Sequence, residues 1–306
     1  MSSPPKITPA LLTRVQAFEA LRRNLELTGL QEKTVATRHH KVRDAIASQL
    51  TVVDHFLTGS YRRQTLIGPL KQADVDVVVV LDRSYRSRGP RAVLDLVRVA
   101  LLVEYTKTPK ISRNGQAVTI TFSDFVLDVV PAFAHPWWAW DNGWDICDSG
   151  SERWISTNPK KHVEIGAGAN RLHNGQLVPR IKQLKAWNRT VGEPLHSFHL
   201  EALAWSIFGP YYGPSWFWSS FTVNADWTSA RYFFDKARQS LSGALSDPAG
   251  TGKDVALYLH GTELKSATSK VTTAYERCLR AEKAAKTGDL AVMHETYRRV
   301  FGDYYP

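Results

Sequence analysis

The chain has 306 residues, of which 43% are hydrophobic and 11% aromatic, enough to bury a core in one large domain or in two lobes. Its two cysteines exclude a disulfide framework, and the lack of CxxC or Cys/His spacing predicts a reducing compartment and no structural zinc. The formal net charge of +10 predicts a surface that attracts nucleoside triphosphates and also nucleic acid.

Two helices are expected at the beginning of the chain. Apolar residues follow helical spacing from Leu11 to Leu25 and again from Val35 to Leu50. The residues before them lack the apolar core of a signal peptide, and the aromatic segment 202–222 is interrupted by glycine and proline. We therefore expect a cytoplasmic protein without a membrane span.

The segment 58–82 carries the most specific pattern of the chain. Gly59 and Ser60 can offer backbone N–H groups and a hydroxyl to a phosphate, since glycine lets the backbone approach closely. Asp74 and Asp76 then begin a very apolar strand; because alternate strand residues share a face, both carboxylates point the same way and suit Mg²⁺. The apolar residues that follow predict a strand buried on both faces. Together these features are typical of nucleotidyltransferases that use a divalent metal.

A third carboxylate is predicted in a hairpin farther along the chain. After an expected helix at 91–105, residues 117–122 and 125–133 read as two strands around a turn. Asp128 lies in the middle of the second strand, where an unpaired carboxylate would cost several kcal/mol to bury, so a shared metal is its expected partner. Asp124 is the alternative ligand, but it lies in the turn and is expected to stabilise that turn instead.

The remainder of the chain predicts a change from strands to helices. Pro131 indicates that the second hairpin strand ends there or lies at a sheet edge. The segment 134–160 is expected to be irregular and to connect two lobes, with helices from there to the end. We therefore expect two domains: residues 1–140, with the first helices and the nucleotidyltransferase core, and residues 141–306, a helical lobe that completes the nucleotide cleft.

Several stretches, in order along the chain, carry a family resemblance. They are GSYRRQT at 59–65, DVDVVVVLD at 74–82, LDVVPAF at 127–133, WISTNPKKH at 154–162, IKQLKAWN at 181–188, SFHLE at 197–201 and FGDYYP at 301–306. In these stretches the chain resembles the bacterial CD-NTases, the cGAS/DncV-like enzymes that make cyclic oligonucleotide signals in anti-phage (CBASS) defence. Gln64 is a departure, because many relatives have glycine before the threonine, and it is expected to restrict the turn slightly.

The resemblance implies an α+β, bilobal, polymerase-β-like fold with a mixed sheet and a carboxy-terminal helical lobe. It implies synthesis of a cyclic di- or trinucleotide from ATP and other nucleoside triphosphates such as GTP. Two Mg²⁺ or Mn²⁺ ions on Asp74, Asp76 and Asp128 would assist attack of a 3′-hydroxyl on an α-phosphate, with release of pyrophosphate. A downstream effector that reads the cyclic product is implied as well.

The resemblance also implies a binding site for the donor triphosphate. Members of the family place a helix lysine and a following serine on this group; Lys185 and Ser197 match these roles, with Lys182 as a second candidate. The two lysines are three residues apart and so share a helical face, whereas the apolar residues of the same stretch occupy another face. Lys185 is expected to be exposed, and the alternative is that the two are surface lysines of an amphipathic helix without a binding role.

Two other functions remain open from the sequence. Template-free transfer of a nucleotide to RNA or protein uses the same carboxylate pattern, although no added RNA-binding module is visible. A nucleic-acid-binding sensor is the other alternative, because basic residues gather in three groups: Arg86, Arg88 and Arg91; Lys107, Lys110 and Arg113; Lys160 and Lys161. Activity without nucleic acid is favoured, since the sequence has no recognisable zinc-ribbon or helix-turn-helix insertion.

Overall fold

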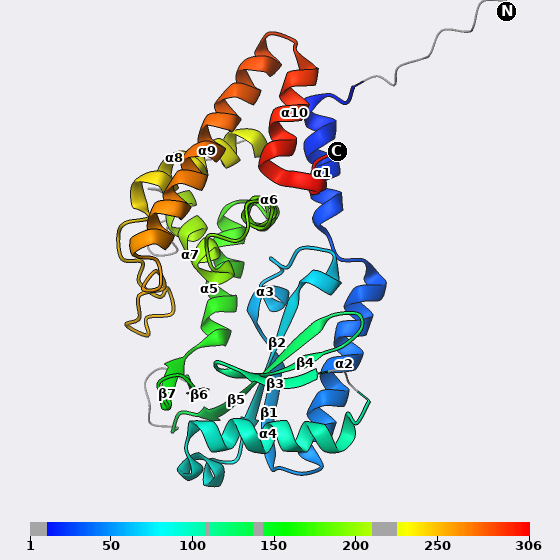
Figure 1. Ribbon diagram of the computed structural model, residues 1–306, viewed down its shortest axis with the longest axis vertical. Coiled ribbons are helices and arrows are strands. Elements are labelled where there is room, and N and C mark those ends of the chain that lie inside the picture. Colours follow the sequence, from blue (N-terminus) through cyan, green and yellow to red (C-terminus); the bar gives the residue numbers. More distant parts are fainter. Residues whose placement is uncertain (1–10, 108–109, 137–142, 210–224) are drawn as a thin grey trace, which may run out of the picture.

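The computed structural model describes residues 11–107, 110–136, 143–209 and 225–306, and it consists of a helical half above a sheet-containing half (Figure 1). The strands are β1 (Val52–Leu57), β2 (Asp74–Leu81), β3 (Lys110–Asn114), β4 (Ala117–Thr121), β5 (Val126–Ala134), β6 (Trp144–Asp148) and β7 (Arg153–Thr157). The α-helices are α1 (Arg14–Leu25), α2 (Gly29–Ala47), α3 (Gly59–Arg62), α4 (Pro90–Glu104), α5 (Pro159–Leu172), α6 (Leu177–Thr190), α7 (Ser197–Phe208), α8 (Asp226–Ser240), α9 (Gly261–Lys286) and α10 (Leu290–Phe301). The α+β class expected from the sequence is confirmed.

The sheet is mixed, with β2 and β5 at its centre. β2 pairs antiparallel with β1 and parallel with β5, while β5 also pairs antiparallel with β4 and, farther along, with β6. Val75 and Val77 enter the apolar cluster on one face of the sheet, and Val78 and Val80 enter the smaller cluster on the other. The prediction of a strand buried on both faces is therefore correct.

Two helices cover one face of this sheet. α2 supplies Val35 and Ile46 to the larger cluster, and α4 supplies Val93 and Val97. The predicted middle helix is confirmed, beginning at Pro90, whose fixed φ suits the first helical turn. No helix within the described ranges is long and apolar enough to cross a membrane.

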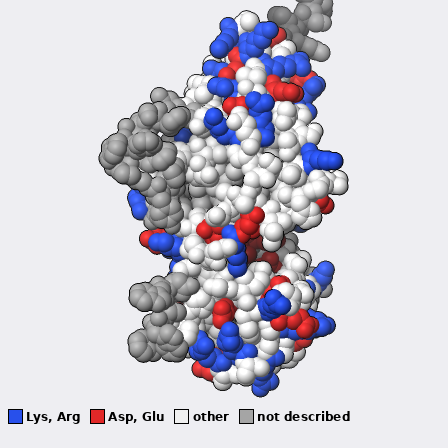
Figure 2. All heavy atoms as spheres, turned by 90° about the vertical axis from the view of Figure 1, so that its left-hand side faces the viewer, with Lys and Arg blue, Asp and Glu red and all other residues white. Residues whose placement is uncertain are grey.

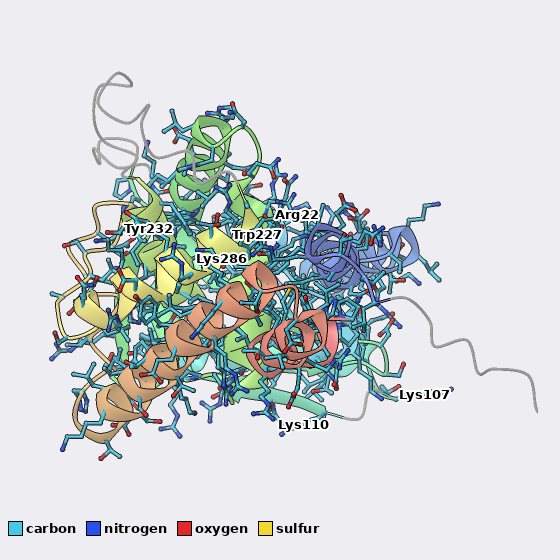
Figure 3. All side chains as sticks on the ribbon, turned by 90° about the horizontal axis from the view of Figure 1, so that it is seen from above. Arg22, Lys107, Lys110, Trp227, Tyr232 and Lys286 are labelled. Atoms are coloured by element: carbon cyan, nitrogen blue, oxygen red, sulfur yellow. The ribbon has the colours of Figure 1, made fainter. Side chains whose placement is uncertain are left out.

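The first helix belongs to the helical half, although it precedes the sheet in sequence. Phe18 of α1 makes edge-to-face contacts with Tyr297 and Tyr305, with ring centroids 5.0 and 5.7 Å apart. Arg22 donates two hydrogen bonds to Asp226 at the start of α8, and Figure 3 shows Arg22 beside Trp227. A capping box at Thr28 then starts α2, so the chain changes direction between the two helices. Both predicted opening helices exist, but they pack against different halves.

Two expectations for the segment after the hairpin are wrong. β6 and β7 form an antiparallel hairpin within 134–160, because alternating Trp144 and Ile146 bury against the sheet. β5 also continues past Pro131 to Ala134 as a central strand, and Pro131 lies between the last residue paired with β4 and the first paired with β6. The expected division at residue 140 remains a prediction.

Candidate active site

A cavity of about 420 Å³ lies between the two halves. Figure 2 shows a notch at this waist, with acidic side chains gathered at it. The lining residues come from the turn after β1, the starts of β2 and β5, the helix α6 and the start of α7. They are Ser60, Arg63, Leu66, Ile67, Gln72, Ala73, Asp74, Asp76, Asp128, Lys185, Asn188, Arg189, Glu193, Leu195, His196, Ser197 and Phe198.

Strand register brings the three predicted carboxylates together. Asp76 of β2 lies directly opposite Asp128 of β5 in the parallel pair, and Asp74 is two residues earlier on the face of Asp76. Neighbouring strands are about 4.8 Å apart, so the three side chains share one small volume. From β4, the Thr119 hydroxyl donates a hydrogen bond of 2.5 Å to Asp128. Asp124 instead lies 3.4 Å from Arg38, away from this group.

The pKa values of the three carboxylates are raised, so these groups favour binding of a proton or a cation. Burial raises the pKa of Asp76 to about 7, and the negative charges of Asp128 and Asp74 add to the effect. Burial also raises the pKa values of Asp74 and Asp128. An all-oxygen set of mutually repelling carboxylates fits Mg²⁺ or Mn²⁺, because a divalent cation removes the repulsion.

The Gly-Ser turn is shaped to admit Asp76. Gly59 has φ +62°, and a Cβ atom at this position would lie 1.7 Å from the Asp76 Oδ2 atom. Glycine is therefore required at this position for two reasons: the backbone is left-handed, and any side chain would collide with Asp76. Ser60 follows at the cavity wall. Gln64, the departure from the family pattern, also has a left-handed backbone, with φ 62°.

Lys185 is buried in an ionic cluster, which corrects the expectation of an exposed lysine. Lys185 is only 8% exposed, and its ammonium nitrogen lies 2.7 Å from Oε1 of the completely buried Glu201. Arg63 donates to both oxygens of Glu201, at 2.7 and 3.1 Å. Burial alone would raise the pKa of Glu201, but Arg63 and Lys185 hold it at about 2. The cluster thus fixes two positive charges beside the carboxylates.

Lys182 lies elsewhere. It is also buried, but its ammonium nitrogen is 2.5 Å from Oε2 of Glu26, in a second cavity of about 500 Å³ that includes none of the three aspartates. A separation of three residues on α6 is therefore enough to direct the two lysines into different cavities. Ser197, in contrast, lines the carboxylate cavity as the first residue of α7, where N–H groups and the helix dipole favour anions.

Sequence reasoning missed several residues that organise the site. Glu201 stands within the quoted SFHLE stretch, where a buried acid among apolar residues signals a charged partner. Arg189 is a second case, because it donates to the carbonyl oxygens of Gly68 and Gln72, both at 3.1 Å, and so ties α6 to the segment before β2. No sequence pattern identifies that contact.

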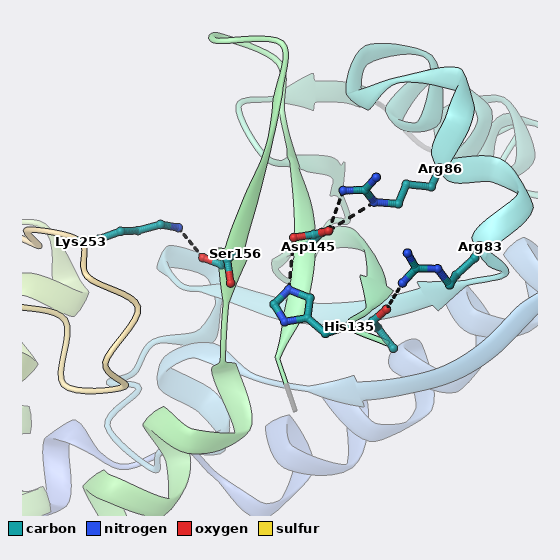
Figure 4. A network of polar contacts seen from close by, with 7 residues as sticks. Arg83, Arg86, His135, Asp145, Ser156 and Lys253 are labelled. Atoms are coloured by element: carbon teal, nitrogen blue, oxygen red, sulfur yellow. Dashed lines mark hydrogen bonds and ion pairs between the residues drawn. The ribbon is translucent and has the colours of Figure 1, made fainter. Parts of the chain in front are cut away.

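Part of the basic surface is neutralised. Arg86 donates to Asp145 at 2.8 Å, and the same carboxylate lies 3.2 Å from His135 (Figure 4). Arg91 lies 3.4 Å from Glu152. Within the part of the chain that the structure describes, the group at Arg86, Arg88 and Arg91 therefore carries less free positive charge than the sequence suggests.

Comparisons with known proteins identify relatives of the chain. The profile of the SMODS family, the Second Messenger Oligonucleotide or Dinucleotide Synthetase domain, matches residues 12–170. A "Probable cyclic nucleotide synthase" of Bacillus cereus is 25% identical over 280 residues, 81% of each chain. A cyclic AMP-AMP-AMP synthase of Acinetobacter is 28% identical over 190 residues, which span 58% of this chain and 53% of that one.

Solved structures share the whole fold. The structure of CdnC from E. coli MS115-1 with ATP superimposes with a TM-score of 0.70 at 15% identity, over 96% of this chain and 99% of that one. Because the SMODS profile covers more than half of the sequence and includes all three aspartates, the chain belongs to the SMODS family of bacterial CD-NTases and is a nucleotidyltransferase.

Proposed function

We propose that this protein makes a cyclic di- or trinucleotide second messenger from ATP and other nucleoside triphosphates, GTP included. The observation that carries the proposal is the register of Asp76 against Asp128, with Asp74 beside them, in a cavity that also contains Lys185 and Ser197. Relatives named as cyclic nucleotide synthases and a fold neighbour solved with ATP support the choice of product and substrate.

Each group in the cavity has a defined part in the proposed reaction. Two bound Mg²⁺ or Mn²⁺ ions would activate a 3′-hydroxyl and offset the charge on the α-phosphate and the leaving pyrophosphate. Asp74, Asp76 and Asp128 would hold these ions, and Thr119 orients Asp128 through its hydrogen bond. Gly59 and Ser60 provide the turn that accepts phosphate oxygens.

The donor triphosphate is assigned to the opposite wall. Lys185 supplies a positive charge whose position is set by Glu201, and Ser197 supplies a hydroxyl at the start of α7. Lys182 is left out of this assignment because it faces the other cavity. Antiviral (CBASS) defence in the cytoplasm, with an effector that reads the product, is the role that the family resemblance implies and that we adopt in this proposal.

The test is incubation of the purified protein with labelled nucleoside triphosphates and Mg²⁺ or Mn²⁺, followed by phosphatase treatment and chromatography. A small phosphatase-resistant product, absent with Asp128→Asn, is expected. If label instead accumulates on added RNA or on a protein acceptor, template-free transfer is the function and the proposal is wrong. Absence of both products under all nucleotide combinations would also contradict it.

A further inference from the structure

A cluster of three histidines lies outside the carboxylate cavity. His39 and His40 are on α2, and His55 is on β1, an edge strand of the sheet. One ring nitrogen of each lies within 4.8 Å of those of the other two. The ring centroid of His39 is 4.9 Å from those of both His40 and His55. None of the three residues lines the cavity of the proposed reaction.

His39 has an unmet hydrogen-bonding requirement. The residue is only 7% exposed, and its buried Nε2 atom has no hydrogen-bond partner among the described residues. Buried polar atoms are normally paired, because leaving one unpaired costs its lost hydration. His40 is exposed and His55 half-buried, so the ring nitrogens can be reached from solvent. A ligand at this position would satisfy His39 and could enter past His40.

For His39 and His55, lowered pKa values favour the neutral form that binds metal ions. Burial lowers the pKa of His39 to about 4, with further contributions from His55, His40 and Arg43, and burial lowers the pKa of His55. Neutral imidazoles are the ligand form, so little proton release opposes binding near neutral pH. Of the nearby charges, Arg43 opposes a cation, but its Nε atom lies 2.8 Å from Asp44, and Asp54 adds a second negative charge.

We propose that His39, His40 and His55 bind one transition-metal ion of the Zn²⁺ type, with water as the fourth ligand. Tetrahedral zinc with Zn–N bonds of about 2.1 Å requires ring nitrogens roughly 3.4 Å apart. The three nitrogens lie within 4.8 Å of one another, so binding requires the rings to move closer together. Imidazole nitrogens favour Zn²⁺, Cu²⁺ and Ni²⁺ over Mg²⁺, so this site and the carboxylate site select different metals. The ion would join α2 to β1. The sequence expectation of no structural zinc considered only cysteine-based spacing.

The test is a titration of the metal-free protein with Zn²⁺ by calorimetry in excess Mg²⁺, which occupies the carboxylates. One equivalent of Zn²⁺ is expected to bind. His40→Ala and His55→Ala should each weaken binding by at least about tenfold, since even loss of an outer-shell partner costs this much. Both variants remove side chains that solvent can reach, so folding should be preserved. His39→Ala is not used, because His39 is buried and its loss could prevent folding. Wild type should also gain melting temperature with Zn²⁺, and the double variant should not.

His260→Ala is the matched control, because His260 is exposed at the start of α9 and distant from the cluster in sequence. It should bind Zn²⁺ like wild type. With Co²⁺ as the probe, the visible absorption of a tetrahedral nitrogen site should appear in wild type and disappear in the double variant. Equal Zn²⁺ affinity in wild type and the His40→Ala/His55→Ala variant would overturn the proposal, as would the absence of binding in wild type.

Discussion

At the scale of single residues, the site depends on charges that are buried and matched. Asp76 and Glu201 are both acids in the interior, but their surroundings shift their pKa values in opposite directions. At Asp76, burial and the charges of Asp128 and Asp74 raise the pKa more than Arg63 and Lys185 lower it; at Glu201, the charges and hydrogen bonds of Arg63 and Lys185 outweigh burial. One group therefore favours a cation or proton, and the other remains ionised over the ordinary pH range.

The first prediction concerns the pH dependence of stability without metal. The pKa of Asp76 is raised to about 7 in the folded protein, so the folded state binds a proton more tightly than the unfolded state does. The resulting contribution to the free energy of unfolding is complete below the unfolded-state pKa, near 4, and is lost as the pH rises through about 7. Asp76→Asn should therefore melt higher than wild type at about pH 8, and the difference should shrink toward pH 4. Mg²⁺ should raise the melting temperature of wild type more than that of the variant, which should release no pyrophosphate. A constant difference across this pH range would contradict the raised pKa.

The second prediction concerns the buried ionic cluster. Lys185→Ala should destabilise the protein by about 3 kcal/mol in urea unfolding, because it leaves buried Glu201 with one partner instead of two. Lys265→Ala, an exposed lysine on α9, should change stability by less than about 0.5 kcal/mol. If Lys185→Ala is as stable as Lys265→Ala, the contact between Lys185 and Glu201 contributes nothing to folding.

At the scale of elements, the site is assembled where short segments meet. α3 has only four residues, and its first residue is the glycine that makes room for Asp76. The β4–β5 hairpin carries Asp128 and its partner Thr119. The turn after β1 and the β4–β5 hairpin are far apart in the sequence. They meet at the site because β2 lies between β1 and β5 in the sheet.

The third prediction separates the backbone requirement from the close contact at Gly59. Gly59→Ala should lower turnover by about 100-fold or more, because the added Cβ forces Asp76 out of position. Gly115→Ala is the matched control: Gly115 has φ +60°, but a Cβ there meets no atom within 4 Å. It should lose stability from backbone strain and keep its turnover. Similar turnover in the two variants would show that the contact with Asp76 has no catalytic consequence.

At the scale of the whole molecule, two apolar cores are joined across the carboxylate cavity. The helical core contains α1 and the carboxy-terminal helices, while the other core contains α2, α4 and the sheet. Polar side chains also connect the halves, among them Arg189 and the Arg63–Glu201 pair. The relative position of the two cavity walls depends on these contacts.

The fourth prediction concerns the basic surface. Since Arg86 and Arg91 are paired with acids, the surface should serve nucleotides, and duplex DNA or RNA should not stimulate product formation at low or high salt. Product formation is measured with and without duplex at two salt concentrations. Salt-sensitive stimulation that is lost in Arg88→Gln/Arg91→Gln would overturn this expectation. Arg86 is left unchanged because its partner Asp145 is partly buried, whereas the Arg91–Glu152 pair is exposed and its loss should cost little stability.

The sequence by itself determined the local structures: the aspartate-bearing buried strand, the hairpin, the middle helix and the two opening helices. Each of these follows from periodicity and turn residues, which act over a few positions. It did not predict the β6–β7 hairpin, because five-residue strands resemble irregular segments in a single sequence. Nor did it predict the separation of Lys182 from Lys185, because helical spacing specifies a face but not what packs against that face.

Only the tertiary structure decided which distant residues meet. The register of Asp76 against Asp128, the burial of Lys185 against Glu201, and the grouping of His55 with His39 and His40 all join separate parts of the chain. Such contacts result from strand pairing and helix packing, in which many side chains must be buried or hydrogen-bonded at the same time. Local patterns specify which residues are available, whereas the packing of the whole chain specifies their partners.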